Sequence, residues 1–242
     1  NYNTVVGDEA GTAITTGDLN TAVGFSALYT EDTGGRSTAI GAYALSVQNV
    51  DGIIYNTAVG YNAGGAITTG LQNTFVGGNS GDAVNTASEN VAFGYNTLST
   101  NTKSFYNVAV GTAALASHNL TSDAAGYNTG IGHNAGAAIT TGTAQVLIGA
   151  LAGDALTDAD YNIAIGVAAL SSDTLGSRTV AIGHAALTAQ NFTSATNTYN
   201  TAVGYEAGGA VTTGIQNTLI GGLAGDALDV GVENVALGYA SL

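Results

Sequence analysis

A short motif recurs along the whole chain and constrains its fold more than any other feature. Each copy has a polar residue, two or three small or β-branched residues and a glycine, as in Asn56-Thr57-Ala58-Val59-Gly60. There are 14 copies; of the 13 intervals between their glycines, ten are 17 residues long, one is 19 and two are 21. The motif glycines are Gly7, Gly24, Gly41, Gly60, Gly77, Gly94, Gly111, Gly132, Gly149, Gly166, Gly183, Gly204, Gly221 and Gly238. Such a period is typical of stacked units that each contact only their neighbours.

A second, longer period is superimposed on the first, because four kinds of turn alternate. The first kind carries Thr-Thr-Gly, the second carries Gly-Asp-Ala, and the third and fourth carry Leu four residues after the motif glycine. Examples are Thr68-Thr69-Gly70, Gly81-Asp82-Ala83, Leu98 and Leu115. The first set lacks its Gly-Asp-Ala turn, which indicates that a whole turn can be omitted from the stack.

The motif residues favour strands, since Val, Ile, Thr and Tyr are strand formers and glycine recurs too often for helices. We therefore predict an all-β fold: a parallel β-solenoid, or β-roll, of about 14 turns with a 17-residue basal period and a 72-residue super-period of four turns. A turn of this length has room for two short strands, so two parallel sheets are expected. We expect residues 1–242 to be one repetitive segment of a longer fibre protein.

Alternation within the motif predicts which side chains face inward. The residue before each motif glycine is apolar and mostly large, as in Val23, Ile40 and Phe93, and is expected to fill the tube. The preceding residue is mostly Ala, with Phe75 in a second-kind turn, and is expected to face outward. A strand that is apolar on both sides is buried on both sides. A second copy of the chain is the simplest partner to cover the apolar side that faces away from the core, so the pattern predicts an oligomer.

Two further columns follow from the stacking. The motif glycines require either a positive φ or the close passage of another backbone, and the pattern leaves both open. The position four residues before each glycine is Asn in 11 of 14 turns, with Ser37, Gln145 and Thr179 as the exceptions. Stacked amides can bond along a ladder. The predicted ladder includes Asn56, Asn73, Asn90, Asn107, Asn200, Asn217 and Asn234.

Composition excludes several classes of partner. The chain has three Lys and Arg against 17 Asp and Glu, a net charge of -14, which argues against a nucleic-acid partner and an anionic membrane surface. Without cysteine, a thiolate metal site is excluded. No run is apolar enough to insert in a membrane. Because no catalytic constellation converges or repeats, we predict a protein that is not an enzyme and needs no cofactor or metal.

Several residue groups are candidate sites. His118, His133 and His184 share no ligand spacing and are expected to be surface or packing residues. The Gly-Asp-Ala turns suggest calcium, but their spacing differs from calcium-binding nonapeptides, and turn formation explains the Asp. Arg36, Lys103 and Arg178 are expected to lie on one edge and to pair with acids such as Glu31, Asp32 or Asp173.

Receptor contacts are expected at exposed aromatic residues and at the longest loops. Tyr61, Tyr95 and Tyr205 directly follow motif glycines and are candidates for stacking on sugars, with packing as the alternative. Residues 46–55, 116–127 and 188–199 form the longest loops, and a rigid scaffold often presents function on its loops. Asn119 and Asn191 lie in two of them, within Asn-x-Thr sequons.

The repeat Asn-Thr-Ala-Val-Gly-Tyr-x-Ala-Gly, at residues 56–64 and 200–208, resembles the YadA-like head repeat of trimeric adhesins and, more closely, related repeats of bacteriophage tail fibres. The resemblance implies a left-handed β-roll, a homotrimer, an extracellular place on a virion or cell surface, and host attachment through a surface glycan or protein. A phage fibre segment is the leading expectation, and a bacterial adhesin head or an extracellular filament subunit is the alternative. A calcium- or ice-binding solenoid is a third, although Thr-Thr pairs in every fourth turn are too sparse for ice.

Overall fold

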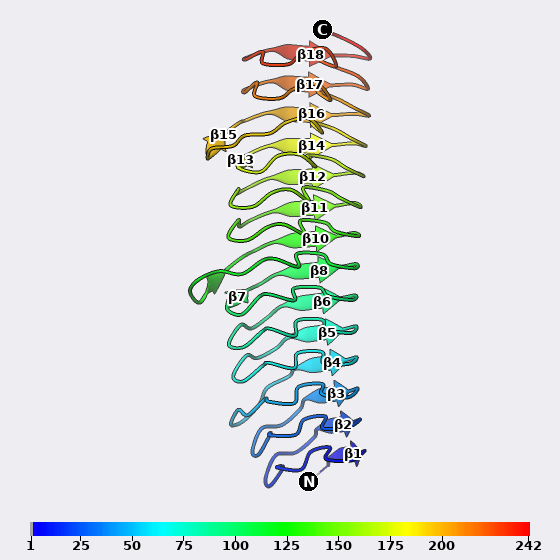
Figure 1. Ribbon diagram of the computed structural model, residues 1–242, viewed down its shortest axis with the longest axis vertical. Helices are drawn as coiled ribbons and strands as arrows, with labels where there is room; N and C mark the ends of the chain where they lie inside the picture. The colour runs from blue at the N-terminus through cyan, green and yellow to red at the C-terminus, as the bar shows by residue number, and fades with distance from the viewer. Residues whose placement is uncertain (1) are drawn as a thin grey trace. The chain divides into compact units, whose positions relative to one another are not determined.

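The structure, a computed structural model, describes residues 2–242 and divides the chain into two compact units, Asn1–Gly126 and Tyr127–Leu242. Each unit is a parallel β-solenoid with one short main-sheet strand per turn (Figure 1). The described residues contain strands, turns and bends but no helix. Together the units confirm the predicted all-β solenoid of about 14 turns.

Seven three-residue strands form the main sheet of each unit. In the first unit they are β1 (Thr4–Val6), β2 (Thr21–Val23), β3 (Thr38–Ile40), β4 (Thr57–Val59), β5 (Thr74–Val76), β6 (Val91–Phe93) and β8 (Val108–Val110). In the second unit they are β10 (Thr129–Ile131), β11 (Val146–Ile148), β12 (Ile163–Ile165), β14 (Val180–Ile182), β16 (Thr201–Val203), β17 (Thr218–Ile220) and β18 (Val235–Leu237).

The strands pair in register with the sequence repeat. Between β4 and β5, for example, Ala58 lies beside Phe75 and Val59 lies beside Val76. Every motif position therefore forms a column along the unit, and substitutions at one position in successive turns become contacts between neighbours.

The expectation of two sheets is wrong, because the remaining walls of each turn are built from left-handed residues. Besides the motif glycine, three positions per turn have positive φ, as shown by Ser26 (50°), Leu28 (52°) and Arg36 (66°). Their N–H groups still bond to adjacent turns: Ser26 donates to the carbonyl of Asp8 at 3.0 Å and Arg36 to that of Asp18 at 3.0 Å. The backbone is thus satisfied between turns without a second extended strand.

The predicted direction of the strand side chains is also wrong. The middle residue of the strand points inward, so Ala58, Phe75 and Leu147 are fully buried. The large residue before each motif glycine faces outward, and Ile40 and Phe93 are 38% and 55% exposed. The row that was predicted to fill the tube therefore faces outward. Its members are Val6, Val23, Ile40, Val59, Val76, Phe93, Val110, Ile131, Ile148, Ile165, Ile182, Val203, Ile220 and Leu237. Because small Ala side chains face inward, the turns collapse onto a narrow core.

Both reasons offered for the motif glycines apply at once. Gly149 has φ of 133°, and a Cβ there would lie 2.5 Å from the carbonyl oxygen of Gly166 in the next turn. The glycine column is therefore a line of backbone-to-backbone contact, where any side chain meets both torsional strain and a clash.

Core volume is shared between two columns. Leu98 and Leu115, four residues after their motif glycines, are buried beside strands whose inward residue is Ala. At the equivalent position of the second-kind turn, a Cβ on Gly81 would lie 2.7 Å from the ring of Phe75. The ring of Phe75 thus occupies the space that Leu fills elsewhere.

The three long loops interrupt this regular build. In the first unit β7 (Ser104–Phe105) pairs with β9 (Ala124–Ala125), and in the second β13 (Gly176–Ser177) pairs with β15 (Thr196–Asn197). These two-residue pairs lie away from the main sheet, on the left in Figure 1. An isolated bridge between Gly35 and Ile53 marks the corresponding place in the first long loop.

Candidate functional site

The asparagine column forms a buried hydrogen-bonded ladder in each unit. Asn73 accepts the N–H of Asn90 on its Oδ1 at 3.0 Å and donates its Nδ2 to the carbonyl of Ala87 at 2.9 Å. The structure links Asn56, Asn73, Asn90 and Asn107 in this way, and likewise Asn200, Asn217 and Asn234. Because each amide side chain satisfies backbone groups, the ladder is structural and leaves little for a ligand.

Glutamines take the place of the missing amide where the column lacks asparagine. Ser37 is too short to reach Asn56, and the Nδ2 of Asn56 instead donates to Oε1 of Gln48 at 2.7 Å. Gln48 in turn donates to the buried carboxylate of Glu31 at 3.0 Å. In the second unit the same relay runs from Asn200 to Gln190 and then to Asp173.

Asp173 is the most deeply buried of the acids whose titration is perturbed. Burial raises the pKa of Asp173, and bonds from the N–H of Phe192, the side chain of Gln190 and the N–H of Gly176 lower it in part. Since Phe192 and Gln190 belong to the third long loop, the carboxylate anchors that loop to the solenoid.

A second polar column, which was not among the predictions from the sequence, links the turns near the start of their loops. The eighth residue after every motif glycine except the last is Thr, Asn or Asp, and each Thr hydroxyl bonds to the next turn. Thr102 donates to Oδ1 of Asn119 at 2.8 Å, and Thr174 to Oδ1 of Asn191 at 3.1 Å. Thr68 and Asn85 form the same pair. The signal is present in the sequence, but it is conspicuous only in the Thr-Thr-Gly turns.

The candidate loop residues Asn119 and Asn191 therefore have a structural use. Both accept the hydroxyl of the preceding turn, as given above, and Asn119 also accepts the N–H of Thr102 at 3.2 Å. Asn119 is half-buried whereas Asn191 is exposed. Of the two, Asn191 leaves more of its amide open to a partner.

The candidate tyrosines Tyr61, Tyr95 and Tyr205 are all more than half exposed. Tyr61 meets Tyr43 edge to face, with centroids 5.9 Å apart, and Tyr205 stacks on His184 at 5.2 Å. Hydrogen bonding to Glu206 raises the pKa of Tyr205. The aromatic rings thus contact one another along the stack while keeping open faces.

Within residues 2–242 Arg36 and Arg178 form no ion pair with an acid, so the predicted pairing is wrong for both. Arg36 donates to the hydroxyl of Tyr55 at 2.7 Å, and Arg178 donates to Oδ1 of Asn197 at 2.5 Å. Glu31 and Asp173 are instead saturated inside the core by backbone and glutamine donors.

Metal-binding candidates do not converge. In the part of the chain that the structure describes, no three His, Asp or Glu side chains are grouped to hold an ion. His133 and His184 are exposed, whereas His118 is buried with Nε2 2.9 Å from Oγ of Ser104. In the Gly-Asp-Ala turns, burial raises the pKa of Asp82 and of Asp154.

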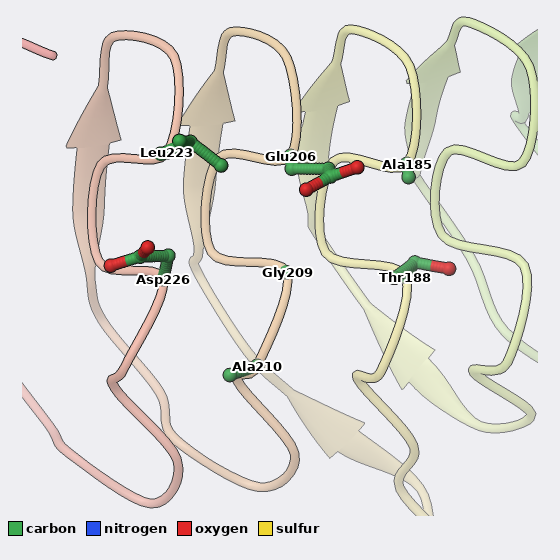
Figure 2. Close-up of a pocket in the computed structure, with 7 residues that line it drawn as sticks. All are labelled: Ala185, Thr188, Glu206, Gly209, Ala210, Leu223 and Asp226. Atoms are coloured by element: carbon green, nitrogen blue, oxygen red, sulfur yellow. The ribbon is translucent and has the colours of Figure 1, made fainter. Parts of the chain in front are cut away.

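A hollow of about 340 Å³ lies over three turns of the second unit. It forms where Gly209 leaves a gap between Thr188 and Asp226 in one column, beside Glu206 in another (Figure 2). Figure 2 shows the Asp226 carboxylate and the Thr188 hydroxyl pointing away from Gly209, so its polar groups do not converge on a ligand.

The main sheet presents an outer face formed by the first and third residues of every strand. Both columns are rich in β-branched side chains, for example Thr57 with Val59 and Ile163 with Ile165. The residues on this face are half-buried or exposed. We refer to this surface as the outer sheet face.

The fold and its columns define a repeat protein of the single-sheet parallel β-solenoid class. Comparisons with protein-family models, curated proteins and solved structures find no match to this chain. Across residues 2–242 there is no helix of the length and apolarity that a membrane span requires.

Proposed function

We propose that this chain is a non-enzymatic structural and adhesive segment of a homotrimeric extracellular fibre, of the kind found in phage tail fibres, which brings a virion to receptors on its host. The outer sheet face carries the proposal. In each unit it is a regular surface, in which an apolar column of Val, Ile, Phe or Leu lies beside a column of Thr, Val or Ile, and the unit's own turns leave it partly exposed.

The size of this face favours self-association. Seven turns at ~4.8 Å per strand give each unit a face on the order of 34 Å long. Large contiguous apolar patches on a protein surface commonly mark interfaces. Each square ångström of apolar area buried is worth roughly 25 cal/mol. Threefold order follows the resemblance to trimeric fibre repeats.

Light scattering of the purified chain tests the assembly. We expect about three times the chain mass of 23.7 kDa, unchanged by a chelator. Ile165→Arg places a charge in the outer sheet face and should yield monomers. Thr213→Arg makes the same charge change at an exposed position outside that face and should remain trimeric. A wild-type monomer would refute the trimer.

Attachment is tested separately, with labelled protein on candidate host cells. Saturable binding by the trimer, lost in the Ile165→Arg monomer through the loss of avidity, supports an adhesive fibre. If the trimer assembles but binds no cell surface, the remaining interpretation is a purely structural subunit of a filament. The same assay on bacterial and animal cells separates a phage fibre from a bacterial adhesin head.

Ice binding is a second candidate, favoured by a column that the sequence analysis does not consider. Thr4, Thr21, Thr38, Thr57 and Thr74 begin five successive strands and line one side of the outer sheet face. The argument that threonines are too sparse therefore applies to the Thr-Thr pairs and not to this column. A monomer that depresses the freezing point without changing the melting point would favour ice over the trimer, since both need the same face.

A further inference from the structure

One exposed edge of each unit is formed by the residue directly before the asparagine ladder position. These residues have positive φ, which turns their side chains away from the core while the ladder residue points inward. We call this column the edge row. Its members are Leu19, Arg36, Tyr55, Gln72, Glu89 and Tyr106 in the first unit, and Tyr127, Ala144, Tyr161, Arg178, Tyr199, Gln216 and Glu233 in the second.

Arg178 lies between two tyrosines in this row. Its guanidinium carbon is 5.1 Å from the centroid of the Tyr161 ring, and its Nη1 donates to Oδ1 of Asn197 in the projecting β15. Tyr161 and Tyr199, in the turns before and after, are 56% and 55% exposed. The cation is thus held in place by a ring face and an amide.

Arg36 is also held by a tyrosine in the first unit, although its edge-row neighbours are Leu19 and Tyr55 and both of its contacts are with Tyr55. Its guanidinium lies 5.6 Å from the ring centroid of Tyr55 and donates to the hydroxyl of the same residue. Both arginines stand next to a long loop, at the same step of the four-turn cycle.

The neutral character of these partners is the informative feature. The chain has 17 acidic residues and only three Lys and Arg, yet within residues 2–242 neither arginine forms an ion pair. A guanidinium has five donors, and only one is used in each case. Each cation is therefore oriented and still free to form a charge-assisted, bidentate bond with a carboxylate.

We propose that the edge row of each unit binds an acidic polysaccharide whose carboxylates are widely spaced, with Arg36 as the carboxylate contact in the first unit and Arg178 in the second. This rests on the proposed attachment function and names its ligand class. Tyr161 and Tyr199 lie two turns apart, about 10 Å at the usual strand spacing, which is close to the length of one disaccharide. Their ring faces suit the C–H faces of sugars on either side of the carboxylate. Densely charged polyanions such as nucleic acids are disfavoured by the net charge of -14.

The test is calorimetric titration of the full chain with an oligosaccharide of alternating glucuronic acid and N-acetylglucosamine, and with its carboxyl-reduced counterpart. We expect the acidic form to bind about tenfold more tightly, as a charge-assisted pair would provide. Arg178→Gln and Arg36→Gln should each weaken binding, and the double variant should abolish the preference for the acidic form. Lys103→Gln removes the same charge outside the edge row and should leave binding unchanged.

Three results would overturn the inference: no binding of the acidic form, equal affinity for both forms, or an equal loss in Lys103→Gln. The scattering mass of each variant should match the wild type, which separates ligand contact from assembly. If the double variant still attaches to cells, the proposed function stands and the ligand assignment is wrong. If the wild type attaches to no cells but binds the oligosaccharide, the attachment function is wrong instead.

Discussion

The sharing of core volume between Phe75 and Gly81 predicts a strong energetic coupling between these two buried residues. Phe75 is fully buried, and its ring fills the space beside Gly64 and Gly81 that a leucine occupies in other turns. The perturbation we consider is the exchange of this pair for the Ala and Leu found at Ala92 and Leu98.

The single changes should both be costly. Phe75→Ala removes a whole buried ring and should lower the free energy of unfolding by about 3–5 kcal/mol. Gly81→Leu alone places a Cβ 2.7 Å from that ring and should cost at least about 1–3 kcal/mol through overpacking. The left-handed backbone at position 81 adds little to the cost of Gly81→Leu, because Leu98 is accommodated at a similar φ of 48°.

The double variant should be more stable than the sum of the single changes implies. The leucine introduced by Gly81→Leu would fill the part of the cavity on its own side, leaving the part beside Gly64. We expect recovery of at least about 2 kcal/mol, well above the ~0.5 kcal/mol scatter of additive pairs.

Urea unfolding, followed by far-ultraviolet circular dichroism, measures the stability of the wild type, of the two single variants and of the double variant. Ala109→Phe serves as the matched control, since Leu98 and Leu115 occupy the positions that correspond to Gly64 and Gly81 around Phe75. It should destabilise strongly. Additive single changes, or a neutral Ala109→Phe, would refute the account of the core as two complementary columns.

Three further outcomes are expected in the same unfolding assay. Gly149→Ala should cost several kcal/mol, about 1–2 from torsional strain and more from the clash with Gly166, whereas Ala at exposed Thr213 should be neutral. Asn73→Ala should cost about 2–4 kcal/mol, because it leaves the buried N–H of Asn90 and the carbonyl of Ala87 without partners. For Asp173 the folded pKa lies above its ordinary value of 3.8, so its penalty is complete above the folded pKa and vanishes below 3.8. Acidification from neutral pH should therefore stabilise the wild type relative to Asp173→Asn, and a pH-independent difference would contradict this.

The sequence was sufficient to predict stacked parallel turns, although not the number of sheets, because the spacing of the repeat sets the length of each turn. A glycine that recurs once per turn, with Asn three positions ahead of an apolar residue, leaves few alternatives to stacked parallel strands. The asparagine column could be located for the same reason, since in-register stacking brings equal positions together. The bonds it makes to backbone groups could not be read from the pattern.

The two wrong inferences about the fold, on side-chain direction and on the second sheet, both arise from the left-handed turns. Alternation shows that Ala58 and Val59 face opposite ways, but it does not show which one is inside. Size favours placing the large residues in the core, whereas the tight left-handed turns leave room only for Ala, except where glycines such as Gly64 and Gly81 make space. The left-handed turns also stand where a second sheet was expected. A positive φ at Leu or Arg could not be predicted from a single sequence.

The long loops show that loop length can vary without a change in strand register. The residue seven positions after the motif glycine is polar and buried in these turns. In third-kind turns it is Glu31, Asn101 or Asp173, and in fourth-kind turns it is Gln48, His118 or Gln190. Each pair closes the core before the loop leaves and is followed by a ladder position where the chain rejoins the stack. A loop can therefore change in length, as the unequal intervals between motif glycines show, without shifting the register of the next strand. Strand register sets the outer sheet face, while loop length and the edge row set what is displayed elsewhere on the unit. If the chain assembles through the outer sheet face as proposed, changes in the three loops and in a few edge residues could alter what it contacts while leaving that face unchanged.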